Sequence, residues 1–211
     1  MKIWKKFGKQ SRVSRAEKKV PAISTIAIFG YADTREDQRL YKSVVEVTKG
    51  LAEAGYTVVD GGGPGVMRAA TVGAKMGGGK VIGVIPRILV GWEHQHDGIT
   101  ELLVVDDMHV RKRKMYELCD AALILPGGFG TLDELFEALT LIQTGKIARF
   151  PIILAGKSYW QGVYDWIVST MLENANINKE DLELFKIADS ADEVVKYIND
   201  FYSKYLLKPN F

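Results

Sequence analysis

Two glycine-rich segments constrain this chain more than any other feature, because each stands between a β-branched run and an amphipathic helical stretch. They are residues 60–67 (DGGGPGVM) and residues 125–134 (LPGGFGTLDE). Glycine lets a backbone approach an anion closely, and the free N–H groups at the start of a helix donate to phosphate oxygens. Neither segment has the Gly-Lys-Ser/Thr ending of a Walker loop or the spacing of the dinucleotide fingerprint. Two such loops predict a phosphate-binding cleft in an α/β protein.

The hydrophobic pattern alternates between strand-like and helix-like periods along most of the chain. Strands are predicted at residues 23–29, 56–59, 80–85, 101–105, 121–125, 152–155 and 184–187, and helices at residues 35–54, 64–76, 108–119, 131–143, 159–173 and 191–206. Such alternation implies right-handed crossovers and a mostly parallel sheet with helices on both faces. No linker divides residues 22–207 into two domains. We therefore predict one Rossmann-like α/β domain over residues 22–207, preceded by a flexible basic extension of residues 1–21.

The charge of the chain is unevenly distributed. Residues 1–20 carry eight basic side chains and one acidic one, so the net charge of +2 leaves −5 on the remainder. A mildly acidic body does not favour nucleic-acid binding, and none is expected. The basic arm, with its interspersed apolar residues, could touch an anionic membrane or RNA. We favour the simpler interpretation of a solvated extension.

Several protein classes and sites are excluded or disfavoured by composition. No apolar run approaches the roughly 20 residues of a membrane-spanning helix, and no apolar segment typical of a secretory signal follows the first lysines. Cys119 is the only cysteine, which excludes an intramolecular disulfide and a cysteine-based zinc finger. A reducing cytoplasm is the expected compartment. His94 and His96 lie in a polar loop at a spacing that is weak evidence for a metal, so no metal site is expected.

Two charged residues stand close to the second glycine loop in sequence. Glu134 follows Thr131 by three positions, which is the spacing of a helix capping box. Thr131 could add a hydroxyl donor to the phosphate site and cap the helix. The functional alternative for Glu134 is a carboxylate held beside a phosphate-binding helix terminus, where it acts on a sugar. Arg111 belongs to a basic run that is either a solvated face or a source of cations for a phosphomonoester.

These motifs resemble those of a known family. Residues 126–134 (PGGFGTLDE) resemble the PGGxGTxxE signature of the LONELY GUY proteins, and residues 108–112 (MHVRK) match the second signature of that family. Arg111 and Glu134 are 23 positions apart, as the catalytic Arg and Glu of the family are. Residues 61–67 (GGGPGVM) are similar to its first glycine loop. The family comprises cytokinin riboside 5′-monophosphate phosphoribohydrolases, often mislabelled lysine decarboxylases, and the resemblance covers roughly residues 22–200.

The resemblance implies a homodimer that hydrolyses the N-glycosidic bond of an adenosine 5′-monophosphate, plain or N6-modified, to a free base and ribose 5-phosphate. No cofactor and no metal are implied. The implied catalytic residues are Arg111 and Glu134. The implied substrate-binding residues are Gly30, Gly62, Gly63, Glu93, Met108, Lys112, Gly127, Gly128, Phe129, Gly130, Thr131, Leu132, Asp133 and Thr140.

Three positions depart from the family pattern: Tyr31 replaces a usual Ser, Arg68 a frequent Glu and Phe129 a common Tyr. They leave open a non-catalytic carrier of a nucleotide or a phosphorylated cofactor, since related Rossmann-like proteins carry molybdenum cofactor. Pyridoxal phosphate-dependent lysine decarboxylation is a further alternative. It is disfavoured because no lysine stands in a recognisable Schiff-base setting.

The helix predicted at residues 131–143 bears on assembly. Leu135, Phe136, Leu139 and Ile142 form an apolar stripe that can pack on the sheet, while Glu134, Glu137 and Thr140 form a polar line for the cleft. The helix that carries Arg111 could form an isologous two-fold contact. The resemblance implies that each cleft is completed partly by the partner subunit. Periodicity alone is equally compatible with a monomer core.

Overall fold

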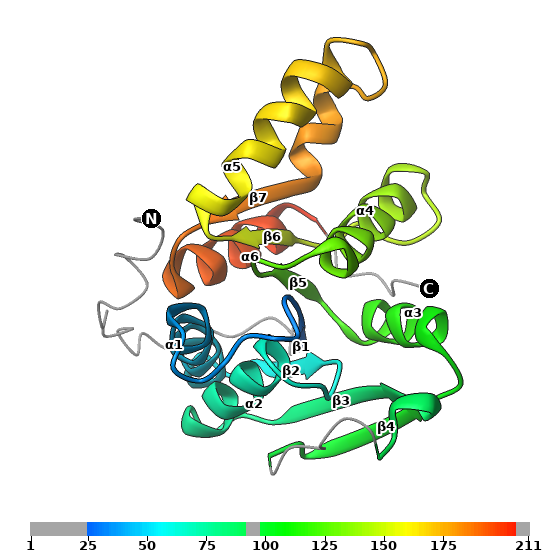
Figure 1. Cartoon of the computed structure of the whole chain (residues 1–211). Coiled ribbons are helices and arrows are strands. Elements are labelled where there is room, and N and C mark those ends of the chain that lie inside the picture. Colours follow the sequence, from blue (N-terminus) through cyan, green and yellow to red (C-terminus); the bar gives the residue numbers. More distant parts are fainter. Residues whose placement is uncertain (1–24, 92–97, 206–211) are drawn as a thin grey trace.

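The structure is a computed structural model that describes residues 25–91 and 98–205 of the 211. A seven-stranded sheet of order β4-β3-β2-β1-β5-β6-β7 forms its centre (Figure 1). All six pairs of neighbouring strands are parallel. The strands are β1 Thr25–Phe29, β2 Thr57–Asp60, β3 Val81–Pro86, β4 Glu101–Val105, β5 Ala121–Ile124, β6 Ile152–Ala155 and β7 Phe185–Ala188.

Helices connect the strands as right-handed crossovers require. They are α1 Arg39–Glu53, α2 Val66–Met76, α3 Met108–Leu118, α4 Phe129–Gln143, α5 Lys157–Trp166 and α6 Ala191–Lys204. Two short 3-10 helices, Arg87–Leu89 and Lys179–Leu184, and a π-helical segment, Ile167–Leu172, complete the helical elements of the described chain. The helical hairpin formed by α5 and the segments that follow it projects beyond the sheet (Figure 1).

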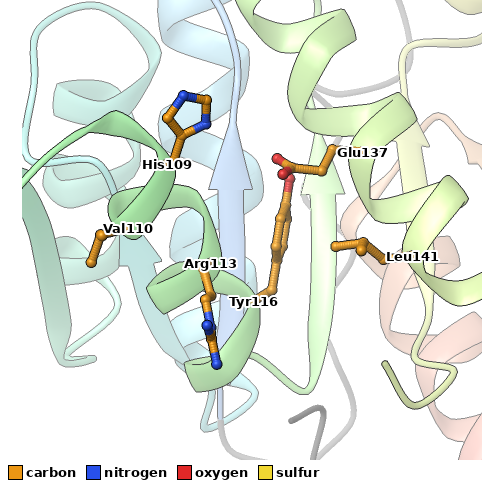
Figure 2. Close-up of a pocket in the computed structure, with 6 residues that line it drawn as sticks. All are labelled: His109, Val110, Arg113, Tyr116, Glu137 and Leu141. Atoms are coloured by element: carbon orange, nitrogen blue, oxygen red, sulfur yellow. The ribbon is translucent and has the colours of Figure 1, made fainter. Parts of the chain in front are cut away.

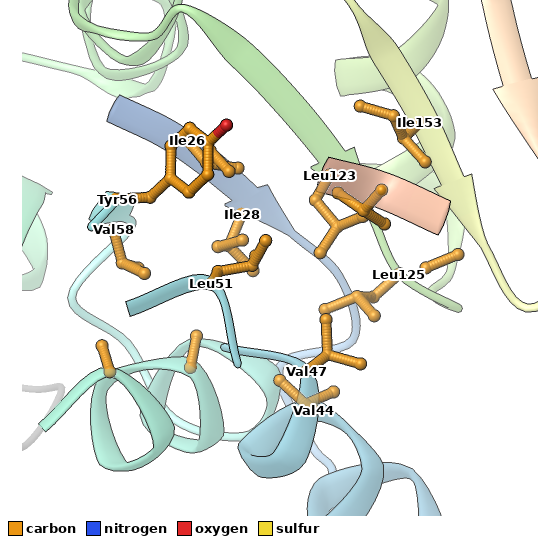
Figure 3. Close-up of a cluster of buried hydrophobic side chains, with 14 of the residues drawn as sticks. Ile26, Ile28, Val44, Val47, Leu51, Tyr56, Val58, Leu123, Leu125 and Ile153 are labelled. Carbon is orange, nitrogen blue, oxygen red and sulfur yellow. The ribbon is translucent and has the colours of Figure 1, made fainter. Parts of the chain in front are cut away.

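Each face of the sheet carries its own hydrophobic cluster, because successive side chains of a strand point to opposite faces. Ile26 and Ile28 of β1 pack with residues of α1, α2 and α6 in one cluster, part of which Figure 3 shows. Ala27 and Phe29 pack with residues of α3, α4 and α5 in the other. Both faces of β1 are therefore buried, which explains its continuous apolar sequence.

The chain reverses its direction of travel across the sheet at β1. It proceeds from β1 through β2 and β3 to β4 at one edge, and then crosses to β5 on the other side of β1. The carboxyl ends of β2, β1 and β5 are therefore adjacent, and a crevice opens at such a switch point in this class of sheet. The first glycine loop follows β2 and the second follows β5, so the topology brings them to the same crevice.

The predicted Rossmann-like α/β fold is confirmed, and the described sheet is wholly parallel. Helix ends differ in places. The helix predicted from residue 35 begins at Arg39, because Gln38 donates to the Arg35 carbonyl and accepts from the Arg35 N–H in a tight turn. The helix predicted at residues 159–173 is α5 followed by the π-helical segment.

Among the described residues no helix is long and apolar enough to cross a membrane. Residues 1–21 and the pair His94 and His96 lie outside the described residues.

Candidate active site

A cleft of about 360 Å³ lies at the carboxyl ends of the central strands. One wall is the end of β1 and its loop, residues 28–33, and another is α3 through Met108, Arg111 and Met115. The start of α4 supplies Gly128, Gly130, Thr131 and Glu134. The second glycine loop, the basic helix and Glu134 thus meet at this cleft, and the first glycine segment contributes Met67 to it.

Arg111 is a buried cation that lacks a carboxylate partner within the described chain. Its side chain belongs to a residue only 7% exposed, and its two terminal nitrogens contact the sulfur atoms of Met67 at 3.2 Å and Met108 at 3.7 Å. No hydrogen-bond partner is found for its Nε among the described residues. Sulfur is a weak acceptor, so this guanidinium is poorly compensated. A buried, under-paired cation in a cleft is suited to receive an anion.

Gly61 provides the space that Arg111 occupies. A Cβ atom at Gly61 would overlap the guanidinium of Arg111 and approach the Met67 sulfur to 2.7 Å. The first glycine loop therefore serves as the floor on which the guanidinium lies. This role differs from the direct phosphate contact expected of that loop.

Glu134 has its pKa raised to about 7, and burial is the main cause. Arg111 and Lys112 oppose the shift by favouring the carboxylate, while Asp133 and Glu137 add to it. A carboxyl poised near neutrality in a cleft is a frequent property of catalytic acids and bases. The backbone at Glu134 is held by the Tyr116 hydroxyl, which donates to its carbonyl at 2.8 Å.

The capping-box interpretation of Glu134 is wrong, and so is the expectation that Thr131 caps the helix. The helix α4 begins at Phe129, with Gly128 as its N-cap residue and no side chain capping it. Thr131 and Glu134 therefore lie inside the helix. Thr131 is buried instead against Gly127, where a Cβ would overlap its side chain.

The uncapped start of α4 contrasts with the start of α3. Asp107 caps α3 by accepting from the N–H groups of His109 and Val110 at 2.8 and 2.9 Å. These bonds, that with Val110 foremost, lower the pKa of Asp107. At α4 no side chain performs this role, and the first-turn N–H groups have no intrahelical acceptor. With the positive end of the helix dipole, they form an anion site that opens on the cleft.

Lys112 does not line the cleft. It is buried between α3 and α4, where its Nζ pairs with Asp133 at 2.8 Å and with Glu137 at 2.7 Å. Burial alone would lower the pKa of Lys112, but its hydrogen bonds to these carboxylates outweigh burial and raise it. The ammonium thus joins the two helices that carry Arg111 and Glu134.

Asp60 is a fully buried carboxyl group under the first glycine loop. It accepts from the Gly62 N–H at 2.8 Å and from the Thr71 hydroxyl at 2.9 Å. Burial raises its pKa to about 6, against the effect of these bonds and of the nearby Arg111 charge. Asp60 is not among the site residues predicted from the sequence. An acidic residue at the end of a buried strand, directly before a glycine loop, is the signal that identifies it.

The other predicted substrate-binding residues divide into two groups. Gly30, Met108, Gly128, Gly130 and Thr131 line the cleft with Arg111 and Glu134. Residues placed outside the cleft lining are Gly62, Gly63, Lys112, Gly127, Phe129, Leu132, Asp133 and Thr140, and Glu93 lies outside the described residues. Met67 and Met115 line the cleft without having been predicted. Their apolar side chains between helices carried no local signal.

The three departures from the family pattern lie in different surroundings. Tyr31 lines the cleft, close to the second glycine loop. Arg68 pairs with Glu36 at 2.9 Å on the outer side of α2. Phe129 is 92% exposed and does not line the cleft. Only Tyr31 is therefore in a position to meet a ligand bound within one protomer.

Two further cavities involve α4. One, of about 550 Å³, lies between α3 and α4, and Figure 2 shows the residues that line it: His109, Val110, Arg113, Tyr116, Glu137 and Leu141. The other, of about 70 Å³, is lined by Thr140 with Gln143 and Met171. Of the polar line predicted for the cleft, only Glu134 faces it. No group of three metal-binding side chains occurs in the part of the chain that the structure describes.

Comparison with known proteins gives a family and a fold. The family model described as "Possible lysine decarboxylase" matches residues 67–198. The cytokinin riboside 5′-monophosphate phosphoribohydrolase of Mycobacterium tuberculosis is 31% identical over 82% of this chain and 91% of its own length. The enzyme of that name, LOG1, from Arabidopsis thaliana is 32% identical over 77% of this chain and 76% of its own.

Solved structures share the fold at lower identity. The molybdenum cofactor binding protein of Rippkaea orientalis superposes with a TM-score of 0.64 at 20% identity, over 85% of this chain and 97% of its own. At that identity the likeness extends to the fold alone.

Proposed function

The chain belongs to the LONELY GUY family, and we propose that it hydrolyses the N-glycosidic bond of an adenosine 5′-monophosphate to release the base and ribose 5-phosphate. The observation that carries the proposal is the pair formed by buried Arg111 and neutral-poised Glu134 in one cleft, beside the uncapped start of α4. The relatives are named for cytokinin riboside 5′-monophosphate. We accordingly propose an adenine or N6-modified adenine nucleotide as the substrate.

The 5′-phosphate is placed at the start of α4. Backbone N–H groups of residues 128–131 donate to its oxygens, and the helix dipole favours its negative charge. This placement directs the sugar toward Glu134, one turn further along the same helix. Arg111 holds the remaining negative charge of the substrate and stabilises the departing base.

Bond cleavage passes through a ribosyl cation resembling an oxocarbenium ion, as in glycoside hydrolysis generally. The Glu134 carboxylate stabilises that cation and orients the attacking water. The C1′–N bond breaks, the hydroxyl of water adds to C1′, and the proton of that water ends on a ring nitrogen of the released base. Binding of the phosphate contributes energy at the reacting centre, so nucleosides without phosphate should react poorly.

A nucleotide panel tests the proposed function. AMP, N6-isopentenyl-AMP and adenosine are incubated with the protein, and free base is measured by chromatography. We expect base release from the nucleotides and little from adenosine. Release from no nucleotide would contradict the enzyme assignment, and tight nucleotide binding in calorimetry without turnover would select a carrier. Tyr31, which lines the cleft in place of the family's Ser, is the residue that favours this second candidate.

Lysine decarboxylation is not supported by the cleft. No lysine lines it within the described chain, and the neighbouring Lys112 is occupied by two carboxylates. A Schiff-base lysine needs an amine that is free to react with the cofactor. Absorbance typical of bound pyridoxal phosphate in purified protein would contradict this conclusion.

We further propose that the chain works as a homodimer of about twice 23.5 kDa in a reducing cytoplasm. Exposed apolar side chains at the start of α3 and α4, those of Met108, Val110 and Phe129, support an interface there. Thr140, which lies outside the cleft of its own protomer, would then be available to a neighbouring cleft. Light scattering after chromatography tests this assembly. A stable, fully active monomer at low micromolar concentration would contradict it.

A further inference from the structure

The second glycine loop is held at two consecutive carbonyl groups by donors from two sides. The Pro126 carbonyl accepts from the Tyr31 N–H at 3.2 Å. The Gly127 carbonyl accepts from the hydroxyl of Tyr159, at the start of α5. No residue of α5 lines the cleft, so this hydroxyl reaches the phosphate loop from behind.

The geometry of the peptide unit transmits the effect of this bond. The described chain contains no cis peptide bond, and in a trans peptide the C=O and the following N–H point in opposite directions. A hydroxyl that draws the Gly127 carbonyl toward α5 therefore turns the Gly128 N–H away from α5. Gly128 lines the cleft and is the N-cap residue of α4. The hydrogen bond from Tyr159 to the Gly127 carbonyl therefore sets the direction in which the Gly128 N–H points.

Thr131 packs against Gly127 and the Gly128 carbonyl accepts from the Leu132 N–H at 3.1 Å, but neither contact is a hydrogen bond to the Gly127–Gly128 peptide plane itself. Gly127 and Gly128 have no side chains, and a Cβ at Gly128 would meet no atom within 4 Å. Glycine pairs sample many backbone conformations, so an unrestrained Gly-Gly peptide would not hold one orientation. The hydrogen bond from Tyr159 acts on this peptide plane directly.

Tyr159 is itself well anchored. Its ring packs edge-on against Trp160 with the ring centroids 5.1 Å apart, and Trp160 is fully buried. Its N–H donates to the Gly156 carbonyl at 3.0 Å in the first turn of α5. Tyr159 is 40% exposed, and its ring is tied to the core through this contact with Trp160.

We propose that Tyr159 is a positioning residue that orients the Gly127–Gly128 peptide, so that the Gly128 N–H donates to the phosphate group of the ligand. The proposal rests on the proposed function for the identity of that ligand. Tyr159 does not touch the substrate. Its hydroxyl acts only through the peptide, and the predicted effect is therefore specific to compounds that carry phosphate.

The test compares Tyr159→Phe with Tyr164→Phe, a matched loss of a hydroxyl from the same helix. Tyr164 packs edge-on against Phe185 and does not line the cleft. Calorimetry with ribose 5-phosphate, AMP and adenosine measures binding. For Tyr159→Phe we expect the dissociation constants of the two phosphate compounds to rise about 3- to 10-fold, the effect of one lost hydrogen bond. Adenosine binding should stay unchanged, and KM for AMP should rise with kcat held within about twofold.

Three outcomes would overturn the proposal: unchanged phosphate binding in Tyr159→Phe, an equal weakening of adenosine, or an equal effect of Tyr164→Phe. Failure of the wild-type protein to bind either phosphate compound would overturn it as well. Binding of ribose 5-phosphate can be measured whether or not any nucleotide is hydrolysed. A lack of turnover would therefore contradict the proposed function, while the binding of ribose 5-phosphate by Tyr159→Phe would still test the proposal.

Discussion

At the scale of single residues, Arg111 and Glu134 are each poorly compensated by the described chain. The buried guanidinium packs on Gly61 and has only sulfur atoms as hydrogen-bond partners there, and burial raises the pKa of the carboxyl to about 7. A bound phosphoribosyl group would provide negative charge for Arg111 and a developing cation for Glu134. Both groups therefore gain more from the transition state than from water, which is the requirement for catalysis.

The Glu134 pKa predicts a pH dependence. If the carboxylate is the active form, kcat/KM for AMP rises with pH through about 7 and then levels, because the fraction of ionised Glu134 rises over that range. Initial rates between pH 5.5 and 8.5 measure it. Glu117→Gln, which changes a carboxyl paired with Arg113 and Lys114 on α3, should leave the profile in place. A profile that is flat across pH 6 to 8 would contradict the role of Glu134.

The meeting of Arg111 and Glu134 in one cleft could be predicted from the sequence, whereas the contacts that support them could not. Arg111 and Glu134 follow from motifs with fixed spacing. The roles of Asp60 and Tyr159 depend on contacts with Thr71 and Gly127, which are 11 and 32 positions away, and no local pattern encodes such contacts. The capping-box hypothesis failed because a helix start shifted by two residues changes which side chain can cap it.

At the scale of elements, the close packing of Arg111 on the first glycine loop predicts what a methyl group added at Gly61 would do. In Gly61→Ala the new Cβ would displace the flexible end of Arg111 while the β2–α2 backbone is kept. We expect kcat/KM to fall about 10²-fold, the cost of misplacing a catalytic group by about 1 Å, with a nearly unchanged unfolding temperature. Kinetics and thermal unfolding together measure this.

Gly162→Ala is the control for a glycine substitution as such. Gly162 lies in α5, and a Cβ there meets no atom within 4 Å. Alanine is the better helix former by about 1 kcal/mol, so this variant should be fully active and slightly more stable. Equal activity losses in the two variants would contradict the proposed role of Gly61.

Element boundaries were the least predictable part of the fold. The strands and helices themselves follow from hydrophobic periods, and the parallel character of the sheet follows from their alternation, whereas the strand order is known only from the structure. The turn before Arg39 depends on a local side-chain bond of Gln38, and α5 continues into a π-helical segment. Hydrophobic periodicity reports neither feature.

At the scale of the whole molecule, the buried Asp60 and the half-buried Glu134 lower the free energy of unfolding as pH rises. The pKa values of Asp60 and Glu134 are raised to about 6 and about 7, above the ordinary 3.8 and 4.5. The folded chain therefore binds protons that the unfolded chain releases between about pH 4 and pH 7. The contribution of these two carboxyl groups to the free energy of unfolding is fully present below about pH 4. It is lost as pH rises through the pKa values of the folded state.

Glu134→Gln isolates the part of this effect that belongs to the cleft. The neutral amide removes the cost of a buried charge, so the variant should unfold at a higher temperature than the wild type at pH 8. At pH 5 the wild-type carboxyl is already protonated, and the advantage should largely disappear. Thermal unfolding at both pH values measures the difference. An advantage that is equal at the two pH values, or larger at pH 5, would contradict the assigned pKa of Glu134.

The most direct test of the central claim is a stoichiometric assay of AMP cleavage by the wild type and Glu134→Gln. Free adenine and ribose 5-phosphate are both quantified over time at pH 8, with circular dichroism confirming that the variant is folded. We predict equimolar release of the two products by the wild type and a rate about 10² to 10³ times lower in the variant, the range for loss of one group that stabilises charge in the transition state. Release of phosphate or adenosine instead, or equal rates from the two proteins, would contradict it.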